Sequence, residues 1–134
     1  MATITKFEDL DVWKLSRKIV NEIYDLSNKD IFSKDFALRD QIRRSAIGIL
    51  SNIAEGFESG TDKQFARYLK IAKGSAGECR AQLYIALDQE YATQKEFGTL
   101  KDKLVNCSGK LSRLVSYLNG GGNTVRELEI IYDT

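Results

Sequence analysis

The chain of 134 residues contains no proline and no histidine, and it has only two cysteines. Without proline, no position forces a helix to kink. Without histidine, the commonest general base and metal ligand is missing. The formal net charge of +1 gives no overall basic signal for binding nucleic acid. These absences favour an architectural role over a catalytic one.

Long apolar runs and targeting signals are also missing. No run of 18 apolar residues indicates a membrane span, and the N-terminus MATITKFEDL lacks the charged-then-apolar layout of a signal peptide. Cys79 and Cys107 are best interpreted as reduced thiols. We therefore expect a cytoplasmic protein with no metal, cofactor or disulfide.

The apolar periodicity predicts four amphipathic helices and no strands. The first two span about residues 10–27 and 36–57. The third and fourth begin at the capping residues Thr61 and Thr93, and the fourth ends at the glycine run 120–122. Residues 28–35 are expected to be a connection. Short links between the helices favour an antiparallel up-down-up-down four-helix bundle over residues 1–119.

The second predicted helix has an unusually wide apolar side. Ile42, Ala46, Ile49 and Ile53 form one stripe, which residues 47, 50 and 54 extend to roughly 160°, against the roughly 100° that one core face needs. A helix of this kind is expected to serve both its own core and a second surface. The simplest second surface is another subunit.

The last predicted helix carries a strict heptad seam, which is typical of a bundle. The seam consists of Phe97, Leu100, Leu104, Cys107, Leu111, Leu114 and Leu118. Both cysteines lie on apolar helix faces and are expected to be small core residues. Trp13 and Tyr68 are likewise expected to pack in the core, although an aromatic ring among basic residues can also stack on a base.

Residues 120–134 form a glycine linker and a tail that is both apolar and acidic. Residues 119–134 carry Arg126 against Glu127, Glu129 and Asp133, so the rest of the chain is about +3. The tail either docks on a neighbouring subunit or a partner protein, or partly covers its own bundle. The pattern leaves both open.

The polar residues of the middle helices suggest a paired network. We expect Arg44, Asn52, Glu55 and Glu78 to connect helices or subunits and to set register and partner choice. The functional alternative is a phosphate or ligand site that uses Arg43 and Arg44. No pair of carboxylates suits acid–base work and no GxxxxGK loop occurs, so an enzyme is not expected.

A basic line follows the third predicted helix, at spacings of three and four residues. Such a line usually indicates a solvated helix surface. The more specific interpretation is a strip that contacts nucleic acid. The candidate contacts are Arg43, Lys63, Arg67, Lys70 and Lys73. In a ring of identical subunits, a modest local charge would be repeated into a larger patch.

Three stretches carry a resemblance to a known family. They are FEDL followed by VW at 7–13, QIRRSA with SNIAEGF at 41–57, and IAKGS at 71–75 with Glu78 and Leu83 following. The chain resembles the proteins encoded within intervening sequences of bacterial 23S rRNA genes. That family often has a proline where this chain has Leu50, and the tail has no counterpart in it.

The resemblance implies a ring-like homopentamer of four-helix bundles without a settled biochemical activity. It also implies a fold similar to the accessory variability protein of diversity-generating retroelements, which is strongly basic and works with a reverse transcriptase. Three functions follow as expectations. They are a non-catalytic scaffold that contacts RNA or a ribonucleoprotein, an accessory subunit of a reverse transcriptase, and a structural assembly whose tail recruits a protein.

Overall fold

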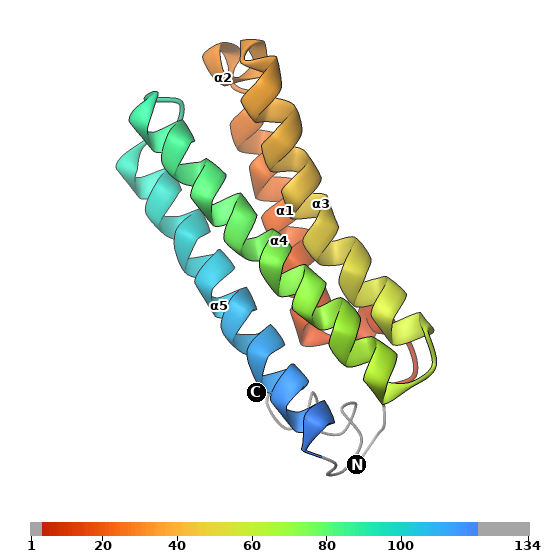
Figure 1. Ribbon diagram of the computed structural model, residues 1–134. Coiled ribbons are helices and arrows are strands. Elements are labelled where there is room, and N and C mark those ends of the chain that lie inside the picture. The colour runs from red at the N-terminus through yellow and green to blue at the C-terminus, as the bar shows by residue number, and fades with distance from the viewer. Residues whose placement is uncertain (1–3, 121–134) are drawn as a thin grey trace.

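All regular elements of the described residues are helices. The computed structural model describes residues 4–120, and four long helices lie side by side in it (Figure 1). They are α1 (Asp11–Ser27), α3 (Phe36–Glu58), α4 (Asp62–Asp88) and α5 (Gln94–Asn119). Two short elements, η1 (Phe7–Asp9) and α2 (Asp30–Lys34), precede α1 and α3. The predicted all-helical class is confirmed, and the tail lies outside the described residues.

Side-chain caps mark where three of the four long helices begin, namely α3, α4 and α5. Asp35 Oδ1 accepts the Leu38 amide at 3.1 Å, and Thr61 Oγ1 accepts the Gln64 amide at 3.2 Å. At α5, Thr93 and Glu96 form a full capping box, as the sequence predicts. Each cap satisfies an amide that would otherwise lack a partner in the first turn.

The connection expected at residues 28–35 contains the short helix α2. Its Phe32 is 1% exposed, and the ring stacks on Tyr91 with 5.0 Å between centroids. Tyr91 also donates a hydrogen bond from its hydroxyl to Asp35 Oδ2 at 3.0 Å. Burial of one aromatic ring therefore orders a segment whose sequence is too short to show helical periodicity.

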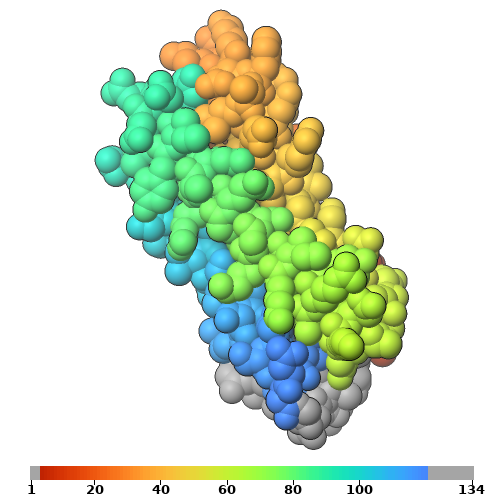
Figure 2. Space-filling model, in the orientation of Figure 1, coloured from red at the N-terminus to blue at the C-terminus, as the bar shows by residue number. Residues whose placement is uncertain are grey.

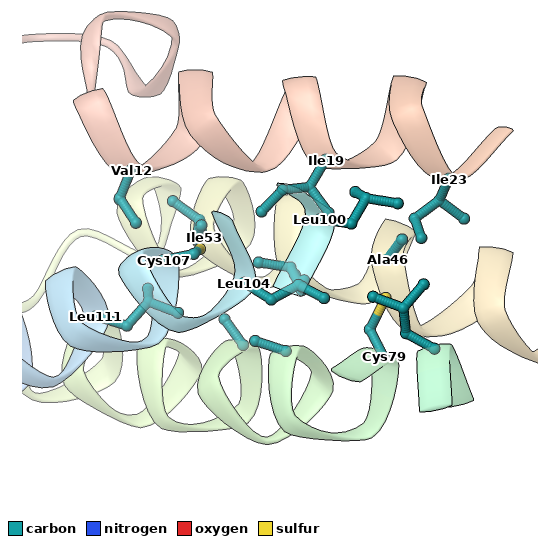
Figure 3. Packing of buried hydrophobic residues seen from close by; sticks show 14 of the residues in the cluster. Val12, Ile19, Ile23, Ala46, Ile53, Cys79, Leu100, Leu104, Cys107 and Leu111 are labelled. Atoms are coloured by element: carbon teal, nitrogen blue, oxygen red, sulfur yellow. The ribbon is translucent and has the colours of Figure 1, made fainter. Parts of the chain in front are cut away.

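The core runs along the centre of the bundle, as Figure 3 shows for part of it. The predicted α5 seam is confirmed, with six of its positions buried and Leu118 half-buried against the core. On α3, the stripe Ile42, Ala46, Ile49 and Ile53 is fully buried. Trp13 packs against this core, as expected, and meets Phe7 edge to face.

Both cysteines are core residues, which leads to a first prediction. Burial raises the pKa of Cys79 and of Cys107 to about 12. Since the thiolate is the reactive form, we expect neither cysteine to react with an aromatic disulfide reagent at pH 8 until the protein unfolds. The reaction is followed by absorbance in buffer and in denaturant. Rapid stoichiometric release of chromophore from the folded protein would contradict the burial.

Candidate functional site

The outer face of α3 and α4 exposes apolar side chains that the bundle does not cover. In Figure 2 the side chains of α3 (orange to yellow) and α4 (green) form much of the visible surface. Ile47 on α3 is 39% exposed, and Ile71 and Ile85 on α4 are 44% and 47% exposed. We call these three residues, with the charged residues Arg44, Glu55 and Glu78, the α3/α4 face. Helical spacing places all six on the outward side of the two helices.

Within residues 4–120, the four residues of the predicted polar network do not pair with one another. Arg44, Glu55 and Glu78 are exposed, and no hydrogen bond or ion pair links any of them to another described residue. Asn52 donates from Nδ2 to the Gly48 carbonyl at 2.7 Å, within its own helix. The expectation of pairing therefore applies to contacts between subunits.

A different polar pair links α3 to α4, and the sequence reasoning missed it. Buried Ser45 has its Oγ 2.7 Å from Gln82 Oε1 and 3.0 Å from the Ile42 carbonyl oxygen. The sequence signal that could have indicated this pair is the position of Ser45 beside the apolar stripe of α3. A buried hydroxyl needs such a partner, because losing its hydrogen bonds to water is costly.

Arg43 connects α3 to the end of α1. Its Nε donates to Ser27 Oγ and its Nη2 to Asn28 Oδ1, both at 2.8 Å. The guanidinium carbon lies 4.5 Å from the centre of the Tyr24 ring. A cation at a helix C-terminus also interacts favourably with the helix dipole. The structure thus gives this predicted nucleic-acid contact a packing role in the bundle.

Three of the predicted cationic contacts meet in one surface hollow. The hollow measures about 400 Å³ and is lined by Lys63, Gln64, Ala66, Arg67, Lys70 and Asn119. We call it the basic hollow. Its three cations form no ion pair with a carboxylate of residues 4–120, and the Arg67 guanidinium lies 6.0 Å from the Tyr68 ring centre. Lys73 is exposed on α4 and does not line the hollow.

A second hollow of about 340 Å³ lies between α1 and α5 and has mixed charge. Its carboxylates include Glu22, which pairs with Lys103, and Glu96, which pairs with Lys29, both at 2.6 Å. The pairing with Lys29 and the hydrogen bond from the Thr93 amide lower the pKa of Glu96. Charges neutralised in this way bind the helices together and leave little to attract a ligand.

The fold and these surfaces define a helical bundle protein whose candidate sites are surface patches. None of the helices within residues 4–120 is both long and apolar enough to cross a membrane. The sequence profile of the 23S rRNA-intervening sequence proteins matches residues 8–113, so the chain belongs to that family. The family membership agrees with the resemblance carried by the three sequence stretches.

One solved structure illustrates the shared fold. It is the crystal structure of a protein with unknown function from the S23 ribosomal protein family from Bacteroides thetaiotaomicron. The similarity has a TM-score of 0.71 at 24% identity, and it covers 78% of this chain and 97% of the other. No curated protein matches the chain.

Proposed function

We propose that the chain is a non-catalytic scaffold of antiparallel four-helix bundles that assemble into a ring-like homo-oligomer. The α3/α4 face carries this proposal. It combines three exposed isoleucines with charges of both signs that have no ion-pair partner among residues 4–120. Apolar residues supply the burial that drives association, and opposite charges set register. The short links at 59–61 and 89–93 support the antiparallel order of the bundle.

A ring places different surfaces of neighbouring subunits against each other. Arg44 and Glu78 then provide one opposite-charge pair across the interface. Truncating one partner of a pair that is desolvated there costs about 2–5 kcal/mol of association free energy. The number five comes from the resemblance, and the exposed face supports the proposal of an assembly.

Light scattering at micromolar concentration tests the assembly. We expect the wild-type mass to be a multiple of the 15.1 kDa chain mass, and we expect Arg44→Ala to lower it. Arg80→Ala is the matched control, because Arg80 is exposed on α4 but outside the α3/α4 face. A well-folded, monodisperse wild-type monomer would refute the scaffold proposal, and an unchanged Arg44→Ala oligomer would refute the charge pairing.

An RNA contact is a second candidate function, supported by the basic hollow. A ring would repeat Lys63, Arg67 and Lys70 in every subunit and would concentrate positive charge. We expect a single-stranded RNA to bind at low salt with an affinity that falls as salt rises, since phosphate contacts release counterions. A titration at several salt concentrations measures this slope. A flat response, or no binding at low salt, would remove the RNA contact.

The reverse-transcriptase accessory function has weaker support. A net charge of +1 provides few phosphate contacts compared with a strongly basic accessory protein. A neighbouring reverse transcriptase gene with a variable repeat would favour this alternative over the scaffold.

A further inference from the structure

We propose that the basic hollow is a docking site for the acidic C-terminal segment of the same chain, residues 125–133. The docked segment would shield the three cations from polyanions and so regulate access to them. The regulatory consequence rests on the RNA contact proposed above, whereas the docking itself does not. Three observations carry the inference. They are the basic hollow, the position at which α5 ends, and the charge of the segment.

The segment starts at the hollow itself. Asn119 is the last residue of α5 and lines the hollow, so the chain leaves the bundle at the rim of the site. Glu127 follows Asn119 by eight residues, which span at most about 29 Å when fully extended. Three glycines at 120–122 permit the chain to reverse direction. A segment attached at this distance has a high effective concentration at the hollow.

The charges of the segment and the hollow are complementary. Residues 121–134 carry three acidic side chains and one basic one, and the hollow contributes three cations without a carboxylate partner among residues 4–120. In the hollow between α1 and α5, by contrast, Glu22 and Glu96 already pair with Lys103 and Lys29, so this hollow offers no comparable excess of positive charge. The basic hollow is therefore a favourable destination for the carboxylates, close to the point of attachment.

Zero-length carbodiimide cross-linking tests the docking directly. The reagent joins an amine to a carboxylate only when the two are in contact, so we expect links from Lys63 or Lys70 to Glu127, Glu129 or Asp133 in the full-length protein. Mass spectrometry identifies the linked peptides. In 1 M salt, where the Debye length is about 3 Å, the links are expected to disappear. Absence of these links at low salt would overturn the proposal.

Isotope mixing separates docking within a chain from docking between chains. Protein labelled with nitrogen-15 is unfolded together with unlabelled protein, refolded as a mixture and cross-linked. We expect linked peptides that are wholly labelled or wholly unlabelled. Mixed labels in the statistical proportion would show that each segment occupies the hollow of a neighbour, which would overturn the intramolecular assignment.

Limited proteolysis with trypsin tests the docking in substituted proteins. Arg126 is the one trypsin site beyond Arg113. Docking should protect it, so we expect Lys63→Glu with Lys70→Glu to accelerate cleavage after Arg126 roughly fivefold, the effect of losing about two surface ion pairs. Lys73→Glu with Arg80→Glu makes the same charge change on exposed residues of α4 outside the hollow. Equal acceleration by both pairs of substitutions would overturn the proposal.

RNA-binding measurements distinguish the two candidate occupants of the basic hollow, the C-terminal segment and RNA. Neutralising the segment with Glu127→Gln, Glu129→Gln and Asp133→Asn should abolish protection of Arg126 and tighten RNA binding. If that variant loses protection but neither it nor the wild type binds RNA, the docking stands and the RNA function fails. If the wild type binds RNA through Lys63 and Lys70 while its segment forms no cross-links, RNA is the occupant and the docking proposal fails.

Discussion

Leu104→Ala is expected to lower the free energy of unfolding by about 2–5 kcal/mol, the range for large-to-small substitutions in a packed core. Leu104 is 1% exposed and belongs to the buried seam of α5. Figure 3 shows its side chain within the cluster that the four long helices share. Removing the side chain beyond Cβ loses burial and leaves a cavity that rigid neighbours only partly fill.

The adjacent residue provides the control for this substitution. Val105 is 44% exposed, so Val105→Ala should change the free energy of unfolding by less than about 0.5 kcal/mol. Denaturant titrations at one protein concentration compare the variants, because association makes apparent stability depend on concentration. Equal losses at the two positions would show that the seam does not face the core.

Gly56→Ala is expected to destabilise the protein although alanine is the better helix former. A Cβ on Gly56 would lie 2.6 Å from Tyr68 Cβ and 3.2 Å from Phe65 Cδ1. Tyr68 Cβ cannot move without its backbone, so α3 and α4 must separate. Overpacking of this kind costs about 1–3 kcal/mol, whereas the gain in helix propensity is about 1 kcal/mol. We expect the steric cost to be the larger.

Gly98→Ala is the matched control and should have the opposite sign. Gly98 lies within α5, and a Cβ there meets no heavy atom within 4 Å apart from its chain neighbours and the adjacent backbone of its own helix. The substitution should therefore stabilise the protein by about 0.5–1 kcal/mol through helix propensity alone. Thermal or denaturant unfolding measures both variants. A stabilising Gly56→Ala would mean that α3 and α4 are less closely packed than the structure indicates.

Local signals in the sequence were sufficient for most of the fold. The seam of α5 repeats every seven residues, and the capping box of Thr93 with Glu96 lies within one turn. Such patterns depend on residues three to seven apart, and the helix geometry that relates them is the same in any protein. The segment 28–35 escaped prediction because α2 depends on Phe32 meeting Tyr91, 59 residues away.

The candidate sites were less accessible to sequence reasoning. Arg43 and Lys63 both read as basic residues on helices, yet Arg43 binds Ser27 and Asn28 while Lys63 lines the basic hollow. Nothing in the spacing of the charges separates these two outcomes. The difference arises from which helix end lies beside each side chain.

The sequence by itself determined the helical class, the main helix starts and the apolar stripes, because backbone hydrogen bonding and side-chain periodicity are local properties. The tertiary structure decided which charges are used in packing and which are exposed. It placed the end of α5 beside the start of α4 and so gathered Lys63, Arg67 and Lys70 around Asn119. That arrangement depends on how whole helices pack, and packing is set by the combined shape of many side chains far apart in the chain.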